Sequence, residues 1–457
     1  MSRPLPRRSF LAVLAGLVAA APVTAVASPR RSPGAAGKSN AVAAGHEFGL
    51  IPDLAGDQST ALQLAIDQAA LKGVALQLPP GRFHVAGVTL RDRSRLIGSP
   101  RTVLQGIGRG PILGGDGAHG FRIEKLRIEG TGTGANGGLV EFKSSRDITL
   151  DDVSLVGATR NGVVLVGCSG RIASCQISRA GAAALWSLDA TGLEIVGNVI
   201  TDCADNGILV WRTTAGEDGT LVAQNRIERI GAASGGSGQY GNGINVFRAG
   251  GVRVTGNQIA DCAYSAVRGN AASNIQIVGN VATRIGEVAL YAEFGFEGAL
   301  IAQNIIEQAA AGISVTNFNE GGRFAVIQGN LVRNLFRREQ EAVDKRGEGI
   351  SVEADAAVSG NTIEGAPTAG VVIGWGRYMR DVNATGNVIR SSRIGIMITR
   401  DPTAGSCLVA QNLISGARDG AIRLMDLGRA VGPDLVRDPL RSERLIVTGN
   451  VATGGGS

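Results

Sequence analysis

A chain of 457 residues is long enough for two or three ordinary domains or for one elongated solenoid. The 68 glycines, 4% aromatic residues and 44% hydrophobic residues suit many short apolar segments separated by turns, and they exclude a disordered chain. The formal net charge of +6 comes from basic residues interspersed with acidic ones, so we expect no nucleic-acid partner.

The first 27 residues have the pattern of an export signal. A basic start ending in Arg7-Arg8 precedes the apolar run SFLAVLAGLVAAAPVTAVA, and cleavage is expected after Ala27. The arginine pair resembles a twin-arginine signal, with ordinary secretion as the alternative. We therefore expect the twin-arginine export machinery as a partner and a location in the periplasm or outside the cell. No later stretch reaches the length of an apolar membrane span, so no membrane anchor is expected in the mature protein.

The segments that follow the signal predict a linker and then a capping helix. Residues 28–45 are polar and small, without periodicity, which is typical of a flexible linker. A helical stripe then predicts a helix over about 57–72, through the apolar residues Leu62, Ala65, Ile66 and Ala69. The next segments alternate with a period of two, so the helix is expected to cover the first turn of a β structure.

One short pattern, seen as IVGNVI at 195–200 and VTGNQI at 254–259, recurs along most of the chain. Its asparagines, spaced 23 to 38 residues apart, are Asn198, Asn225, Asn257, Asn280, Asn304, Asn330, Asn361, Asn387, Asn412 and Asn450. Repeats of this length indicate a solenoid.

Each copy can be divided into three short strands with two inward apolar residues per strand. The absence of a helical stripe in the copies favours an all-β parallel β-helix with about 22–27 residues per coil. Asparagine suits a tight turn because it tolerates the left-handed conformation and its side chain bonds to the backbone. We therefore expect the stacked asparagines to form a hydrogen-bonded ladder along one corner, as part of the scaffold.

The five cysteines show neither zinc-site spacing nor the even number that internal pairing requires. Cys203 and Cys262 occupy matching positions two coils apart, roughly 10 Å, which is too far for a disulfide. Buried small hydrophobic side chains are the better interpretation.

The start of the folded part, FGLIPDLAGDQSTALQLAIDQAALKGVALQLPPGRFHVAGVTL, carries a resemblance to known proteins. It resembles the N-terminal cap and first coil of pectate-lyase-like right-handed β-helix proteins, which include pectinases, other polysaccharide lyases and phage tailspikes. With the signal and the repeats, the whole chain resembles a family of twin-arginine-translocated repeat proteins of unassigned activity. The resemblance implies a single right-handed parallel β-helix over residues 46–457. It implies no particular reaction, because this fold hosts many.

The strand Gly-Ile-x-Val offers a way to find a site, because its outward residues form columns about 4.8 Å apart when coils are aligned. These columns mix aromatic and arginine side chains with two carboxylates. Aromatic rings pack on sugars, and arginine binds carboxylates through two parallel hydrogen bonds, so the columns predict a groove for an acidic polysaccharide. The residues expected to bind it are Trp211, Arg212, Asn245, Phe247, Arg248, Asn270, Asn317, Asp355, Trp375 and Arg400.

Four residues of this face are candidates for catalysis: Arg268, Tyr291, Glu293 and Glu353. Elimination on a uronic acid needs a cation, a base and an acid, parts that Arg268 and Tyr291 could supply. Inverting hydrolysis needs two carboxyl groups about 6.5 to 9.5 Å apart, a spacing that Glu293 and Glu353 could reach. Among enzymes a lyase or epimerase is favoured over an inverting hydrolase. A non-catalytic glycan-binding or envelope-surface solenoid is the alternative, since the catalytic motifs of polygalacturonases are absent.

No cofactor is expected, although Glu293, Glu353 and Asp355 are the groove carboxylates that could contribute to a calcium site. Two insertions, at 231–241 and 333–347, precede strands of the candidate group and are expected to form walls around it. The segment at 427–444 is expected to fold over the last strand edge, unless another subunit covers that edge. The oligomeric state stays open.

Overall fold

The computed structural model describes residues 42–108, 110–131, 137–236, 238–338, 346–440 and 442–454. The export signal expected over 1–27 lies outside these residues, as does most of the expected linker. The linker ends earlier than predicted, because strand β1 (Val42–Ala44) already pairs in parallel with β2 (Ala75–Gln77). A 3-10 helix, η1 (Gly45–Phe48), follows β1 directly.

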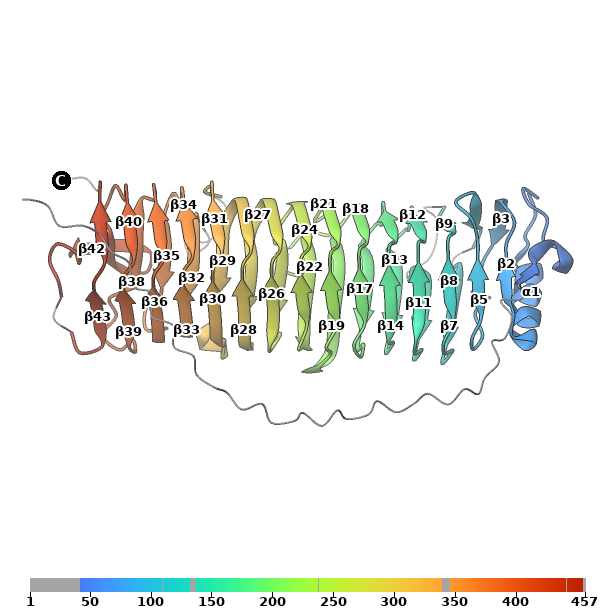
Figure 1. Ribbon diagram of the computed structural model, residues 1–457, viewed down its shortest axis with the longest axis horizontal. Coiled ribbons are helices and arrows are strands. Elements are labelled where there is room, and N and C mark those ends of the chain that lie inside the picture. The colour runs from blue at the N-terminus through green and yellow to red at the C-terminus, as the bar shows by residue number, and fades with distance from the viewer. Residues whose placement is uncertain are drawn as a thin grey trace, which may run out of the picture. The chain divides into compact units, whose positions relative to one another are not determined.

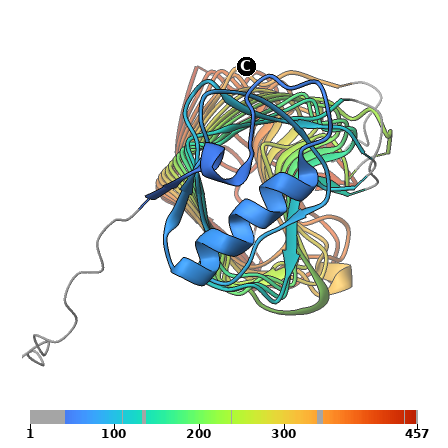
Figure 2. The same cartoon turned by 90° about the vertical axis from the view of Figure 1, so that its right-hand side faces the viewer.

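A capping helix, α1 (Ser59–Lys72), covers the N-terminal end of the solenoid (Figure 2). Its buried face consists of the four predicted residues, Leu62, Ala65, Ile66 and Ala69. The helix ends at Gly73, whose left-handed φ of 64° lets its N–H bond to the last turn.

The rest of the described chain is a parallel β-solenoid whose strands stack side by side (Figure 1). One sheet, the 16-stranded sheet, runs from β1 to β43 (Leu445–Thr448). Most strands pair with the third strand further along the chain, as β23 (Arg253–Thr255) pairs with β26 (Ile275–Val278). The all-β solenoid and its capping helix are therefore confirmed.

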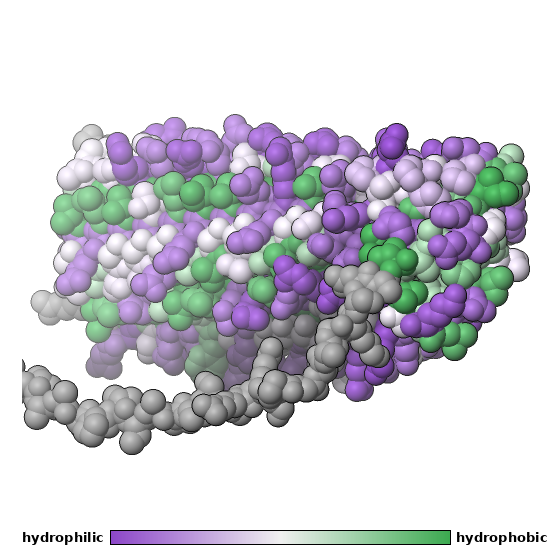
Figure 3. All heavy atoms as spheres, turned by 45° about the vertical axis from the view of Figure 1, so that its right-hand side comes forward, coloured by the Kyte–Doolittle hydropathy of each residue, from purple (hydrophilic) through white to green (hydrophobic). Residues whose placement is uncertain are grey.

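The core runs along the axis of the solenoid because inward residues of neighbouring coils stack in register. Val254 aligns with Ile277, and the next coils continue with Ile301 and Ile327, all fully buried. Burial of each such side chain contributes about 1.5–3 kcal/mol. The same stacking produces bands of hydrophobic and hydrophilic residues on the surface (Figure 3).

The asparagine ladder forms along one corner as predicted. In each of its nine steps the side-chain Nδ2 donates to Oδ1 of the next asparagine at 2.9–3.1 Å, beginning with Asn198 to Asn225 and ending with Asn412 to Asn450. The backbone N–H of each also donates to that same oxygen, as Asn257 does to Asn280. Each Oδ1 therefore accepts two hydrogen bonds from the coil before it.

The predicted reason for asparagine at this corner was wrong in one respect. None of the ten asparagines has a positive φ; the left-handed residue is the one before each of them. That residue is glycine in most copies, such as Gly256 with φ 65°, and glutamine in others, such as Gln224 with φ 56°. The preceding residue therefore makes the turn, and asparagine is needed for its paired donor and acceptor.

Part of the segment at 427–444 folds over a strand edge, in line with the first of the two predicted alternatives. Strand β42 (Arg429–Asp434) pairs antiparallel with β41 (Ile422–Asp426). All five cysteines are buried and unpaired, which confirms their interpretation as small hydrophobic residues. In the described part of the chain, no helix has the length and apolar character needed to cross a membrane.

Candidate functional site

The predicted columns form on the strands that carry the candidate site, β22 (Asn242–Gly250), β25 (Val267–Asn270) and β27 (Val281–Glu293). Their register places Asn245 beside Arg268 and Arg268 beside Tyr291. In the second column Asn270 lies between Phe247 and Glu293. Register alone therefore brings residues from distant parts of the sequence together.

A cleft of about 640 Å³ lies over these strands. Its lining includes the four candidate catalytic residues, five of the predicted binding residues and two residues of the first insertion: Arg268, Tyr291, Glu293, Glu353, Trp211, Asn245, Phe247, Asn270, Asn317, Gly238 and Gln239. The first insertion therefore forms a wall, as predicted. Residues 339–345 of the second insertion lie outside the described residues.

The floor of the cleft is a buried ionic network and not an open face. Arg268, only 5% exposed, donates from Nε and Nη2 to the two carboxylate oxygens of Glu293 at 2.6 and 2.8 Å. Its Nη1 donates to Glu287 at 3.2 Å, and Asn270 Nδ2 donates to Glu293 at 3.1 Å. Arg268 thus neutralises carboxylates of the protein itself.

The electrostatics of this floor keep Arg268 charged and the Tyr291 phenol neutral. Burial disfavours the charged guanidinium, but the charge and hydrogen bonds of Glu293 and the charge of Glu287 outweigh it and raise the pKa of Arg268. Burial, assisted by the Glu293 carboxylate, raises the pKa of Tyr291 well above its usual range. The Tyr291 phenol therefore stays protonated. The Arg268 guanidinium lies 4.9 Å from the centroid of its ring.

Aromatic rings form one flank of the cleft. The Trp211 and Phe247 ring centroids lie 5.9 Å apart, edge to face. Trp211 Nε1 donates to Asn245 Oδ1 at 3.1 Å, and Asn245 Nδ2 donates to the Gly238 carbonyl at 3.0 Å. These hydrogen bonds tie the aromatic flank to the first insertion. Exposed Arg248 lies at the rim, with its guanidinium 4.7 Å from the Phe247 centroid.

The opposite end of the cleft lies at a turn of the coil. Glu353 Oε2 accepts a hydrogen bond from the Phe318 N–H at 2.6 Å, at the start of the 3-10 helix η2 (Phe318–Glu320). Asn317, in the left-handed conformation with φ 70°, accepts from the Phe294 N–H at 3.4 Å. This hydrogen bond fixes the orientation of the Glu353 side chain, which lines the cleft.

Five predicted binding residues do not line the cleft: Arg212, Arg248, Asp355, Trp375 and Arg400. Arg248 reaches its rim, as described above. Arg212 turns away and donates to the Ala190 carbonyl at 3.1 Å, and Arg400 pairs with Asp426 at 2.9 Å. The prediction that these two arginines face the groove was wrong, because an outward position on a strand does not fix the direction of a long side chain at the strand end.

Trp375 was predicted to bind ligand but packs against a satellite core. Its neighbours there include Val372, Met397 and Met425, together with Ala430 from β42. Strand β42 thus packs on the same cluster as Trp375, and the cleft does not extend along the whole column of outward residues.

Sequence reasoning missed two residues of the site. Phe294 lines the cleft, and Glu287 accepts a hydrogen bond from Arg268. Thr316, an outward residue of the predicted column, also lines the cleft. Phe294 directly follows Glu293, so the end of that strand was a usable signal. The sequence signal for Glu287 was weaker, because it consists only of a carboxylate directly before a short apolar run.

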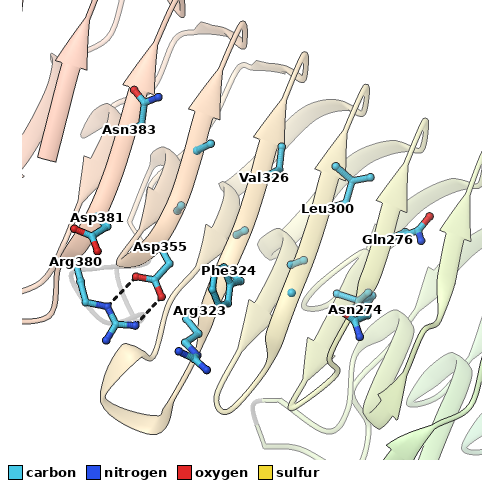
Figure 4. A pocket seen from close by; sticks show the side chains of 16 residues that line it. Asn274, Gln276, Leu300, Arg323, Phe324, Val326, Asp355, Arg380, Asp381 and Asn383 are labelled. Carbon is cyan, nitrogen blue, oxygen red and sulfur yellow. Dashed lines mark hydrogen bonds and ion pairs between the residues drawn. The ribbon is translucent and has the colours of Figure 1, made fainter. Parts of the chain in front are cut away.

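Asp355 belongs to a second concave surface of about 870 Å³, shown in Figure 4. This surface, here called the outer groove, lies on the 16-stranded sheet. It spans β26, β28 (Glu297–Ala302), β30 (Arg323–Gln328), β33 (Ala354–Ser359) and β36 (Arg380–Thr385). Within it, Arg380 binds both carboxylate oxygens of Asp355 at 2.8 and 2.6 Å.

The three carboxylates considered for calcium therefore do not share one surface. Glu293 and Glu353 line the cleft, whereas Asp355 lies in the outer groove. Within the described ranges, no group of three histidine, cysteine, aspartate or glutamate side chains is arranged to hold a metal ion.

Residues 137–321 and 214–389 match the family model for the right handed beta helix region, and together these matches span more than half of the chain. The chain belongs to this family. With its parallel solenoid, it is a right-handed β-helix of the pectate-lyase-like superfamily.

Solved structures are similar to this chain at low sequence identity. The N-terminal fragment of bacteriophage phi29 gene product 12 is 12% identical over 91% of this chain and 71% of its own, with a TM-score of 0.51. The catalytic unit of the GH87 alpha-1,3-glucanase from Streptomyces thermodiastaticus is 16% identical over 93% and 70%, with a TM-score of 0.45. The surface adhesin PfbA of Streptococcus pneumoniae is 13% identical over 84% and 91%, with a TM-score of 0.46. At these identities the likeness concerns the fold alone.

Proposed function

We propose that this protein is an exported β-helix that binds a polysaccharide in the cleft over β22, β25 and β27. One observation carries the proposal: aromatic rings and side-chain amides line the same cleft. Trp211, Phe247 and Phe294 supply apolar surfaces, while Asn270 and Asn317 supply hydrogen-bonding groups. A sugar ring has an apolar C–H face and hydroxyl edges, so this combination matches both of its surfaces.

The finer parts of this proposal come from the sequence. They are the twin-arginine route with cleavage after Ala27, and the likeness to twin-arginine-translocated repeat proteins. The pairing of most strands with the third strand further along supports our interpretation that each coil contains three strands.

An acidic polysaccharide is the proposed ligand class, with Arg248 as the residue that selects it. Arg268 is bound by two carboxylates of the protein, so it is not the cation that meets the ligand. Arg248 is exposed at the rim, and its guanidinium stacks on Phe247. Within the described chain, its guanidinium donates one hydrogen bond, from Nη1 to the Thr213 carbonyl at 3.0 Å. The other N–H groups of its guanidinium can therefore bind a sugar carboxylate next to the Phe247 ring.

Retention on immobilised polygalacturonate, alginate and a neutral β-glucan tests whether the cleft binds a polysaccharide and whether it selects an acidic one. Phe247→Ala should weaken binding to every polymer that the protein retains, by about tenfold, because a stacking surface is lost. Arg248→Ala should weaken binding to the uronate polymers alone. Phe336→Ala, which removes an exposed phenylalanine on another face, is the matched control and should bind like the unmodified protein.

Two results would overturn the proposal. Binding to none of the three polymers, or equal binding by the Phe247→Ala variant, would exclude the cleft as a saccharide site. An equal loss for uronate and neutral polymers in Arg248→Ala would exclude the acidic class while leaving the cleft in place.

Hydrolysis is a second candidate function, favoured by one specific observation. Glu293 and Glu353 line the same cleft from strands two coils apart, roughly 10 Å at the backbone. Elimination with Arg268 as the neutralising cation and hydrolysis with Glu293 both require the Arg268–Glu293 ion pair to open. The spacing of the two carboxylates favours hydrolysis. New reducing ends from a retained polymer, abolished by Glu353→Gln, would establish hydrolysis. Their absence leaves binding as the function, and unsaturated products would instead indicate elimination.

A further inference from the structure

The cleft and the outer groove meet at one turn of the coil. Glu353 faces the cleft and Asp355 faces the outer groove, with only Ala354 between them. Arg380 contacts both, because its backbone N–H donates to the Glu353 carbonyl at 3.0 Å and its guanidinium binds Asp355. The two concave surfaces are therefore neighbours around a single corner of the solenoid.

The corner itself carries an aromatic ring. Phe318 begins η2, donates its N–H to Glu353 on the cleft side, and lies with its ring centroid 4.6 Å from the Arg380 guanidinium on the groove side. Phe294 lines the cleft just before this corner, and Phe324 lines the outer groove just after it. Three phenylalanines thus mark a path from one surface to the other.

The outer groove repeats the chemistry of the cleft. Its floor contains Leu300 and Val326 with Phe324, whose side chain is 52% exposed. Figure 4 shows the amides of Gln276 and Asn383 on opposite sides of that floor. Apolar surface with amides on both sides is again suited to a sugar chain.

Phe324 occupies a position that the backbone does not favour for a bulky residue. Its φ is 63°, and the corresponding position in neighbouring coils holds residues that tolerate a left-handed backbone: Asn274, Gly298, Asp355 and Asp381. A large side chain is strained there, and such strain clusters at binding sites. The scaffold therefore does not explain an exposed phenylalanine at this position, whereas a ligand contact does.

We propose that the outer groove is a second saccharide subsite, continuous with the cleft around the Phe318 corner, so that the ligand is a chain long enough to occupy both. This inference rests on the proposed function of the cleft. It adds a binding surface on the outside of the 16-stranded sheet, and it makes affinity depend on chain length.

Phe324→Asn is the variant that tests it. Asparagine removes the ring and accepts the left-handed backbone, as Asn274 does at the same position, so the fold should be retained. Affinity is measured for short and long oligomers prepared from polygalacturonate and from a neutral β-glucan. We expect Phe324→Asn to weaken binding of the long oligomers by about tenfold, with binding of the short ones unchanged.

The controls separate this inference from the function on which it depends. Phe247→Ala should weaken short and long oligomers alike, and Phe336→Ala should change neither. An unchanged long-chain affinity in Phe324→Asn, or an equal loss for short and long oligomers, overturns the outer groove as an extension. An unchanged affinity in Phe247→Ala overturns the cleft itself. The melting temperature of Phe324→Asn should equal or exceed that of the unmodified protein, which excludes misfolding as the cause of any loss.

Discussion

The asparagine corner and the floor of the cleft are both rows of buried polar residues stacked from coil to coil, yet they are built in opposite ways. The corner repeats one residue in ten copies, and each copy satisfies its neighbours through the same hydrogen bonds. The floor changes residue at each step, from Asn245 to Arg268 to Tyr291. A column that keeps its residue serves the scaffold, whereas a column that changes it creates a local shape and charge.

Arg268→Ala should give the largest effect, because it leaves two buried glutamates without their shared cation. Breaking a buried ion pair costs about 3–5 kcal/mol of the free energy of unfolding. A shift of the urea midpoint measures this loss. Arg284→Ala, which breaks the exposed pair with Asp261, is the matched control and should leave the midpoint almost unchanged. A small effect of Arg268→Ala would show that the floor is not a structural network.

Asn280→Ala tests the other row. Asn280 accepts from both nitrogens of Asn257 and donates to Val254 and Asn304, so the change leaves several buried groups unsatisfied. We expect a loss of about 3 kcal/mol, with binding in the cleft unchanged wherever the variant is folded. Asn450→Ala, at the partly exposed end of the ladder, should cost clearly less. Equal costs at the two positions would contradict the ladder as a stacked network.

Asp218 is a buried carboxylate that belongs to neither row. Substituting it tests the effect of burial on stability apart from the effect of ion pairing. Burial raises its pKa, although Thr220 donates to it and Arg212 lies 4.0 Å away. The folded state therefore holds this proton more tightly than the unfolded state, and stability is lost as pH rises through the folded pKa. Asp218→Asn should raise the melting temperature at neutral pH by a few degrees. The difference should vanish below the ordinary aspartate pKa of about 3.9. A constant difference across pH would rule out this ionisation as the cause.

The smallest expected effect concerns the cysteines, which behave as parts of the core. Burial raises the pKa of Cys175, Cys203 and Cys407 to about 12. Native protein should therefore not react with a thiol reagent at mildly alkaline pH, while the unfolded chain should expose all five cysteines. Rapid labelling of native protein would show that a coil opens locally.

The register of the site could be predicted because the repeated asparagine served as a fixed reference point in each coil. Once Asn257 and Asn280 were aligned, the strands after them were aligned as well, and Arg268 had to lie beside Tyr291. Local periodicity also identified α1, since its apolar residues follow one helical face. These features depend on short stretches of chain, so the sequence contains enough information to derive them.

The roles of the same residues were harder to predict, because side-chain partners come from other coils. Arg268 was expected to meet a substrate carboxylate, but Glu287 and Glu293 of the next coil bind it. Glu353 and Asp355 were expected on one groove, but the chain turns a corner between them. Neither outcome follows from spacing, because a turn of one or two residues changes the surface that a side chain faces.

The repeat pattern alone specifies an all-β solenoid with a capped start, an asparagine corner and a defined set of stacked residues. A repeat specifies its own stacking, because identical neighbours can satisfy each other in only one register. Where that stack is accessible depends on the folded arrangement of the whole chain. The first insertion walls the cleft, β42 packs on the same cluster as Trp375, and the cleft and the outer groove meet at the Phe318 corner. Accessibility depends on non-repeating segments packing against the repeat, and their positions are set by contacts that no single coil contains.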